Sequence, residues 1–274
     1  MANPAFDFDY LRQLVRAKSA VVLEVHKDYL AELHLGAIAQ QAGFDSIAAL
    51  VENLKKTPFG KWHIQTIEAL MINETSFFRD RYPFEVMQSS VLPALIQARS
   101  IERSISIWCA ACSTGQEPYS IAMLIRDRFP NLANWKIRII ASDFSGKALA
   151  RAKQGSYSTL EVNRGLTVER RNRYFRQSGS SWQIRDDIRQ MVEFQQMNLI
   201  DSWTNLPLLD VIFLRNVLIY FNIETKRAIL QQARQYMRQD SYLFLGSGET
   251  TFHLDNMFEP VRDAKSLYHR LRTA

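Results

Sequence analysis

The chain has 274 residues, a formal charge of +6 and an ordinary share of aliphatic and aromatic residues, so it is long enough to bury a full hydrophobic core. An apolar run of about 18 residues, the length of a membrane-spanning helix, does not occur. The first residues also lack the basic and then apolar pattern of a secretory signal, so we expect a cytoplasmic protein without membrane insertion. Only two cysteines occur, Cys109 and Cys112; without a second ligand pair for zinc, we expect reduced thiols and no metal.

The first 72 residues carry seven basic and eight acidic side chains, so the basic surplus belongs to the rest of the chain, where it favours an anionic partner. This first part shows helical periodicity and no convincing strand, which predicts a small all-helical domain. A further helix is expected over Phe84–Ala98. The helices predicted in the first part are Phe8–Val15, Asp28–Ala42, Ser46–Leu54 with Asp45 as its cap, and Lys61–Ile72.

Strand, tight loop and helix follow one another from Ser104 to Phe129. The apolar alternation of Ile105–Cys109 predicts a strand, and a run of small residues ending at Gly115 lets a ligand approach the backbone closely. Thr114 with Glu117 matches a capping box at the start of the helix. Because Gly115 is the only glycine of the loop, a dinucleotide pyrophosphate is disfavoured, while a nucleoside ligand fits.

Strands and helices then alternate, which predicts a doubly wound, Rossmann-like parallel sheet with helices on both faces. A hairpin around the turn Ser178-Gly-Ser180 interrupts the alternation and predicts a small β-subdomain inserted at about residues 172–190. The last two strands are expected to form an antiparallel pair. The predicted strands are Trp135–Ala141, Met191–Phe194, Asp210–Leu214, Tyr242–Leu245 and Ser266–His269; the helices are Lys147–Ala152 and a segment from Asn222, as N-cap, to Met237.

Polar side chains stand where the predicted strands end: Glu117, Asp143, Asn198, Arg215 and Asn216. The carboxyl ends of parallel strands share one edge of a sheet, where such folds bind their ligands. A carboxylate suits an ammonium group, an Asp suits a ribose and an Asn suits an adenine edge. This combination describes S-adenosylmethionine better than a nicotinamide cofactor. Asp143 by itself is equally well explained as the N-cap of the helix that follows it.

Five motifs now make the chain recognisable: NETSFFRD from Asn73 to Asp80, then CSTGQEPYS, ASDFS, FQQMNL and RNVLIYF. In this order they resemble the bacterial chemotaxis receptor methyltransferases, the CheR-type enzymes. The resemblance covers nearly the whole chain, up to GSGET and the closing KSLYHR. It implies a helical domain over residues 1–72, a motif and connecting helix over 73–103 and a methyltransferase domain over 104–274.

The family transfers a methyl group from S-adenosylmethionine to glutamate side chains of chemoreceptor cytoplasmic domains, which gives glutamyl methyl esters and S-adenosylhomocysteine. The resemblance implies that Arg79 and Tyr220 face the transferred methyl as catalytic residues. Ala111 stands where many members carry Gly. The implied cofactor contacts are Asn73, Thr75, Arg79, Glu117, Asp143, Asn198, Leu199, Arg215 and Asn216.

Chemoreceptor cytoplasmic domains are therefore the expected partners; a regulatory protein remains open, and no nucleic acid is expected. In the family the helical domain meets the receptor, which makes Lys18, Lys27, Lys55 and Lys56 candidate contacts. Family members that capture a receptor tail resemble one another in a longer, glycine-bearing hairpin loop, so the short turn here favours an enzyme without a tail tether. Two alternatives stay open: a regulatory adaptor that binds S-adenosylmethionine, and a methyltransferase for another acceptor.

Overall fold

The computed structural model describes residues 6–25, 28–263 and 266–272. The chain forms two compact units, one made of Met1–Ile72 with Tyr220–Thr225 and the other of Asn73–Ile219 with Lys226–Ala274. We describe each unit by itself. No helix of the described residues is long and apolar enough to span a bilayer.

The first unit is helical, as the sequence predicts. Its core is closed by apolar side chains that lie on the inner faces of the helices, among them the fully buried Leu11, Leu35, Leu50 and Ile67. The expected cap Asp45 is wrong by one residue, because Ser46 is the N-cap and its hydroxyl accepts from Ala49 N at 3.1 Å. The helices are α1 (Phe8–Ser19), α2 (Asp28–Gln41), α3 (Ile47–Lys56) and α4 (Lys61–Leu70).

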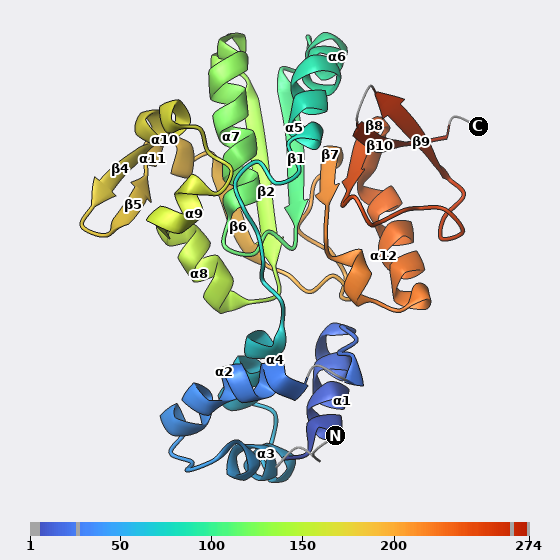
Figure 1. Ribbon diagram of the computed structural model, residues 1–274. Coiled ribbons are helices and arrows are strands. Elements are labelled where there is room, and N and C mark those ends of the chain that lie inside the picture. The colour runs from blue at the N-terminus through green and yellow to red at the C-terminus, as the bar shows by residue number, and fades with distance from the viewer. Residues whose placement is uncertain (1–5, 26–27, 264–265, 273–274) are drawn as a thin grey trace. The chain divides into compact units, whose positions relative to one another are not determined.

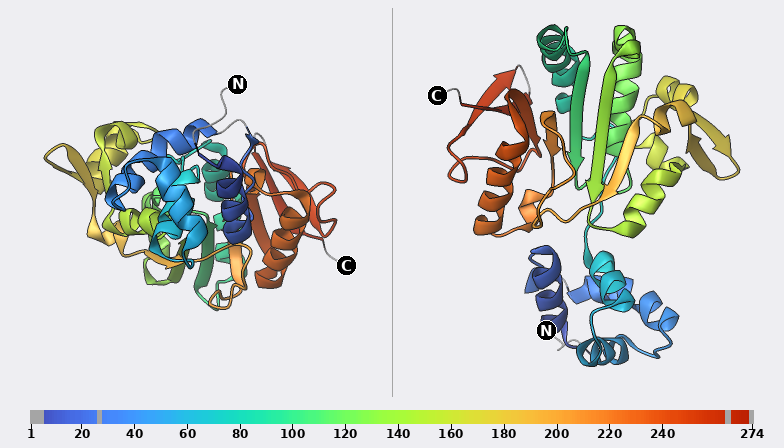
Figure 2. Two further views of the ribbon diagram at one scale, coloured as in Figure 1. Left: turned by 90° about the horizontal axis from the view of Figure 1, so that it is seen from below. Right: turned by 180° about the vertical axis from the view of Figure 1, so that it is seen from behind.

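The second unit is built on a seven-stranded sheet in the order β6-β2-β1-β7-β8-β10-β9 (Figures 1 and 2). Five strands are parallel, and β10 runs antiparallel to β8 and β9, which confirms the antiparallel pairing predicted for the last strands. The strands are β1 (Ser104–Ala110), β2 (Lys136–Asp143), β6 (Val192–Gln196), β7 (Leu209–Leu214), β8 (Met237–Leu245), β9 (Phe258–Asp263) and β10 (Ser266–Leu271). The sequence missed β9, because Pro260 and three charged residues hide its alternation.

Helices α7 (Gln116–Arg128) and α8 (Gly146–Gln154) pack against β2 and β6, and α12 (Ile223–Tyr236) precedes β8. The single helix predicted over 84–98 is instead α5 (Tyr82–Val86), a π-helical turn (Met87–Val91) and α6 (Leu92–Ala98). The wider turn has a local cause: Pro93 has no N–H to donate to the carbonyl four residues earlier, and Leu92 N donates to Met87 O.

A second, three-stranded antiparallel sheet has the order β3-β5-β4. Its hairpin joins β4 (Phe175–Ser178) to β5 (Ser181–Ile184) at the predicted turn, where Gly179 has a φ of 59°. The third strand, β3 (Ser156–Ser158), has only three residues and is too short for a sequence pattern to reveal. The short helices α9 (Thr159–Asn163), α10 (Val168–Tyr174) and α11 (Asp186–Arg189) surround this sheet (Figure 1).

Candidate active site

The parallel strands of the larger unit bring the predicted polar residues to one edge of the sheet. Ala110 of β1 pairs with Ser142 of β2, and Leu214 of β7 pairs with Leu245 of β8, so these strands end side by side. Asp143 is the last residue of β2, and Arg215 directly follows β7. Two predicted site residues, Asp143 and Arg215, therefore lie at the carboxyl edge of the sheet.

The loop between β1 and α7 is held in place by two hydrogen bonds of Ser113. Ser113 N donates to Asp143 Oδ2 at 2.8 Å, and the Ser113 hydroxyl donates to Asn73 O at 2.8 Å. Ala111 and Ser113 have positive φ values of 53° and 51°, a conformation that favours Gly and agrees with the Gly that the resemblance implies at position 111. The β1 loop, β2 and the segment from Asn73 are therefore tied together.

The predicted capping box is wrong. Gly115, with a φ of 93°, is the N-cap of α7, and no side chain caps the helix. The Thr114 hydroxyl donates to Gln116 Oε1 at 2.8 Å instead, and the Glu117 carboxylate is engaged elsewhere. A side chain at position 115 would place its Cβ 2.9 Å from Ala152 Cβ, so the close approach of α8 requires glycine here.

Asp143 is not the N-cap of α8. That position belongs to Ser145, whose hydroxyl accepts from Ala148 N at 3.1 Å. The Asp143 carboxylate is buried and accepts from Ser113 N and from Ser145 N, the latter at 2.9 Å. Of the two interpretations that the sequence left open for this residue, the helix cap is excluded.

The centre of the site is the buried guanidinium of Arg215, whose side chain is only 1% exposed. It donates to Glu117 Oε2 at 2.7 Å, to Asp80 Oδ2 at 2.7 Å and to Arg79 O at 3.1 Å. Its Nε atom is buried and has no hydrogen-bond partner in the described part of the chain. Burial raises the pKa of Glu117 above its ordinary value of 4.5, although the charge of Arg215 acts in the opposite direction. The site therefore holds one unsatisfied donor beside a desolvated carboxylate.

The turn that carries Arg79 has a strained backbone. Phe78, Asp80 and Arg81 have φ values of 48°, 67° and 50°. The turn is anchored by the ring of Phe77, which is packed edge to face on Tyr157 and Phe175, and by Phe78 N, which donates to the Ser120 hydroxyl at 2.9 Å.

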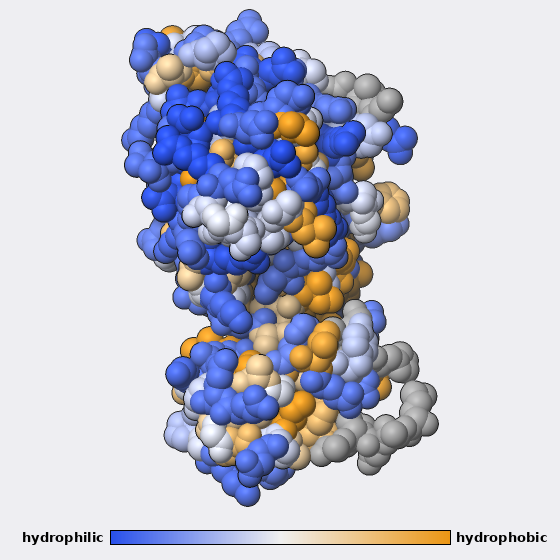
Figure 3. Space-filling model, turned by 60° about the vertical axis from the view of Figure 1, so that its left-hand side comes forward, coloured by the Kyte–Doolittle hydropathy of each residue, from blue (hydrophilic) through white to orange (hydrophobic). Residues whose placement is uncertain are grey.

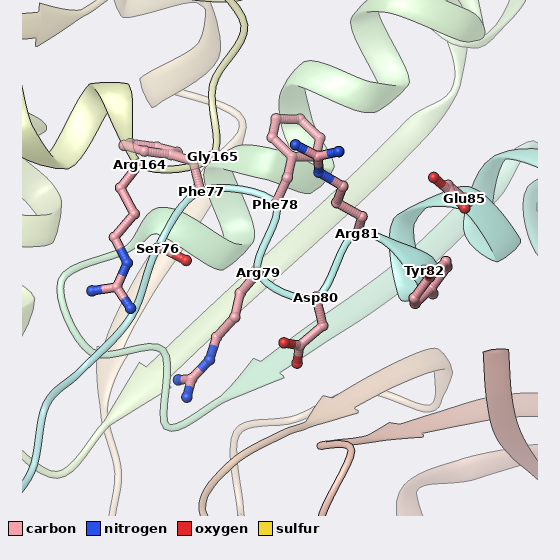
Figure 4. A pocket seen from close by; sticks show the side chains of 10 residues that line it. All are labelled: Ser76, Phe77, Phe78, Arg79, Asp80, Arg81, Tyr82, Glu85, Arg164 and Gly165. Carbon is pink, nitrogen blue, oxygen red and sulfur yellow. The ribbon is translucent and has the colours of Figure 1, made fainter. Parts of the chain in front are cut away.

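Figure 4 shows the side chains of Arg79 and Asp80 on one side of this turn and those of Phe78 and Arg81 on the other. The turn borders an open pocket of about 500 Å³, which Arg164 and Gly165 also line. Arg79 Nη1 donates to Glu74 O at 2.8 Å, and within the described residues the other amino group of its guanidinium has no hydrogen-bond partner and can serve a ligand.

The other predicted residues differ in exposure. Leu199 is buried, Thr75 and Asn198 are half-buried, and Asn73 is exposed. Tyr220 ends the 3-10 turn Leu218–Tyr220 and belongs to the first compact unit, where its carbonyl accepts from Val22 N at 2.8 Å. The structure thus brings Glu117 and Arg215 into contact, and Asp143 onto the β1 loop, while Arg79 and Tyr220 belong to different units.

Sequence reasoning missed three residues that hold this site together: Asp80, Ser113 and Glu249. Asp80 is part of the FFRD motif, and Glu249 follows β8 in GSGET as Asp143 ends β2. The rule that polar residues after parallel strands line one edge therefore also applies to Glu249. The contact of Ser113 with Asp143 runs through its backbone N–H and leaves no signal in the sequence, and the contact of its hydroxyl with Asn73 O joins residues that are far apart in the chain.

The structure shows the surroundings of both cysteines and of Lys55, while the receptor contacts predicted for the lysines stay a prediction. Cys109 and Cys112 are buried free thiols, and burial raises the pKa of each. No cluster of metal-ligating side chains occurs among the described residues. Lys55 pairs with Asp7 at 2.8 Å and with Glu52 at 2.9 Å, and Lys27 lies outside the described residues.

Comparison with known proteins decides the family. The model described as "CheR methyltransferase, SAM binding domain" matches residues 73–266. The chain belongs to the CheR methyltransferase family. Chemotaxis protein methyltransferase 1 of Pseudomonas aeruginosa is 40% identical over 271 residues, which cover 97% of this chain and 98% of that protein. Chemotaxis protein methyltransferase Cher2 of Pseudomonas putida is 37% identical over 99% of this chain and all of its own length, and a chemotaxis protein methyltransferase of Vibrio parahaemolyticus is 34% identical over 95% and 94%.

The edge residues of this CheR-family sheet fit S-adenosylmethionine. Its methionyl group carries a carboxylate and an ammonium, and the site offers a buried guanidinium with an unsatisfied Nε next to a buried carboxylate. Ala111, Ser113 and Gly115 have small side chains or none, so a ligand can approach the backbone of the β1 loop closely. The observed donors and acceptors therefore match the charges of the cofactor.

Proposed function

We propose that this protein transfers the methyl group of S-adenosylmethionine to glutamate side chains of chemoreceptor cytoplasmic domains in the cytoplasm. The observation that carries the proposal is the match to curated chemotaxis methyltransferases along nearly the whole chain. The intact FFRD and IYF motifs argue against a regulatory adaptor, because a protein that only binds the cofactor has no need of residues that face the acceptor.

The residues of the carboxyl edge are assigned to the cofactor. Arg215 donates to the methionyl carboxylate and Glu117 accepts from the ammonium, which explains why both are buried although they are charged. Asp143 accepts from the ribose hydroxyls. The remaining contacts along the cofactor are assigned to Asn73, Thr75, Arg79, Asn198, Leu199 and Asn216.

The bound cofactor supplies an electrophilic methyl carbon, so the protein has to position the acceptor rather than activate it. A glutamate with an ordinary pKa of about 4.3 is ionised at neutral pH and needs no general base. We assign to Arg79 the task of holding one oxygen of this carboxylate while the other attacks, and to Tyr220 the task of orienting the reacting groups. Positioning of this kind lowers a barrier by as much as about 7–11 kcal/mol.

The test is transfer of a radiolabelled methyl group to purified chemoreceptor cytoplasmic fragments, followed by mild alkali. We expect label that alkali releases, as for a glutamyl ester, and that disappears when the target glutamates are changed to alanine. Arg79→Ala serves as the matched inactive variant. Cofactor binding without transfer to a panel of receptors would contradict the proposal and favour an adaptor; alkali-stable label would favour another acceptor.

We propose further that receptor recognition does not depend on a C-terminal receptor tail. Capture by strand addition needs a free edge, and the edge strands β3 and β4 have only three and four residues. The face of the larger unit that carries this small sheet is predominantly hydrophilic (Figure 3). Calorimetry with receptor tail peptides is expected to show no binding, and methylation rates are expected to be equal for receptors with and without a tail. Tight peptide binding would overturn this part of the proposal.

A further inference from the structure

Glu249 lies in the turn after β8, and its carboxylate accepts hydrogen bonds from four backbone N–H groups. Oε2 accepts from Asn216 N at 2.7 Å and from Gly246 N at 2.6 Å. Oε1 accepts from Val217 N at 2.8 Å and from Ile219 N at 3.3 Å. Glu249 is only 8% exposed, so these bonds form where water does not compete with them.

Three of the four donors belong to the segment that follows β7, which carries Arg215 and Asn216 and leads to Tyr220. One carboxylate thus joins the ends of the neighbouring strands β7 and β8 at the edge of the sheet where the site lies. The Arg215 side chain has its own partners in Glu117 and Asp80. The backbone of Asn216 depends on Glu249.

Asn216 needs such support because its backbone is in the left-handed region, with a φ of 57°. Its side chain also lies against the β8 turn: a Cβ at Gly246 would be 2.7 Å from Asn216 Nδ2, 2.8 Å from Asn216 N and 2.7 Å from Glu249 Oε2. The absence of a side chain at position 246 and the carboxylate of Glu249 together define where the Asn216 amide stands.

We infer that Glu249 is a positioning residue of the methyltransferase site: it preorganises the segment from Asn216 to Ile219 so that the Asn216 side chain is aimed at the cofactor before binding. The inference rests on the proposed function for the role of Asn216. Preorganised polar groups gain affinity because the ordering has already occurred in the free protein.

The matched control lies at the other end of the same strand. Asp210, near the start of β7, is 1% exposed and accepts from Ser106 N at 2.8 Å and from Arg99 Nε at 2.8 Å. It is therefore a second buried carboxylate that binds a backbone N–H and stabilises the fold. It holds no part of the carboxyl edge.

The experiment compares Glu249→Gln with Asp210→Asn in the full chain. The Gln side chain keeps one acceptor oxygen and turns its amide NH₂ toward two of the four N–H donors, so the segment after β7 loses one or two of its three hydrogen bonds to residue 249. We expect the dissociation constant for S-adenosylhomocysteine to rise at least about tenfold in Glu249→Gln. We also expect kcat to fall while KM for the receptor fragment stays within about twofold of the wild type, since the variant does not alter the assigned acceptor-binding side chain. Asp210→Asn is expected to lower Tm and to leave cofactor affinity unchanged.

A second variant, Gly246→Ala, keeps the charge of Glu249 but crowds both Asn216 and the Glu249 carboxylate, and it is expected to weaken the binding of S-adenosylhomocysteine in the same way. If Glu249→Gln does not fold, Gly246→Ala alone tests whether the position of Asn216 determines cofactor affinity. If Glu249→Gln and Gly246→Ala both have the cofactor affinity and the kcat of Asp210→Asn, the inference is overturned and Glu249 is a structural residue. S-adenosylhomocysteine binding is measured without an acceptor, so it tests the role of Glu249 whether or not a receptor is methylated. Wild-type protein that binds S-adenosylhomocysteine but methylates no receptor would contradict the proposed function only.

Discussion

Glu117→Gln removes one of the two carboxylates that neutralise Arg215, and it tests both the stability and the cofactor affinity of the site. The Arg215 side chain is 1% exposed, while its partners Glu117 and Asp80 are 12% and 39% exposed. Loss of one partner of a buried ion pair costs about 3–5 kcal/mol. Because Gln keeps an acceptor oxygen, Asp80 keeps its charge and the desolvation cost of the Glu117 charge is removed, we expect a smaller loss of about 2 kcal/mol. At about 2–4 °C per kcal/mol, Tm falls by about 4–8 °C.

The same substitution removes the charge assigned to the cofactor ammonium. A hydrogen bond to a charged group contributes about 1.5–3 kcal/mol, so the dissociation constant for S-adenosylhomocysteine is expected to rise about 10- to 150-fold. Isothermal titration calorimetry measures the affinity and differential scanning fluorimetry measures Tm. Glu193→Gln is the control, because the Glu193 carboxylate is 55% exposed and pairs with Arg138 at 2.7 Å away from the site. An unchanged affinity with a lowered Tm would refute the assignment of Glu117 to the cofactor, and a Tm change as small as that of the control would refute the structural reasoning.

Three further predictions concern the same edge of the sheet. Burial raises the pKa of Glu117, so its carboxylate loses its charge at a higher pH than a free glutamate does. S-adenosylhomocysteine is therefore expected to bind progressively more weakly as pH falls from neutral, and calorimetry at several pH values should show this slope in the wild type and a flatter profile in Glu117→Gln. Arg79→Ala is expected to lower kcat at least about 100-fold and cofactor affinity only a few-fold. Arg79→Lys is expected to recover part of the rate, because Lys keeps the charge without the planar pair of donors. A cofactor affinity that falls in proportion to kcat would make Arg79 a binding residue only. Ala111→Gly is expected to raise the free energy of unfolding, measured by urea denaturation, by about 0.5 kcal/mol. Gly removes the backbone strain at a φ of 53°, and the greater chain entropy of Gly in the unfolded state offsets part of this gain. A lower stability would show that the packing of the Ala111 methyl group contributes more than the strain costs.

The sequence by itself determined the order of the elements, the parallel sheet with its late antiparallel strand, and the family. These features rest on local patterns: β1 shows an apolar alternation, β7 contains the apolar run from Val211 to Leu214, and motifs such as FFRD are contiguous. Part of the site was also within reach of the sequence, because Asp143 ends β2 and Arg215 and Asn216 directly follow β7, at strand ends that are visible in the pattern.

Only the tertiary structure decided which polar groups meet. Arg215 pairs with Asp80, which is 135 residues away in the chain, and Glu249 accepts from the backbone of Asn216, which is 33 residues away. Sequence spacing left a choice of roles for Asp143, and in the fold its carboxylate accepts from Ser113 N, which is 30 residues away. The physical reason is that a buried donor or acceptor takes the partner that strand order and register bring within 3 Å, and no local pattern encodes that distance.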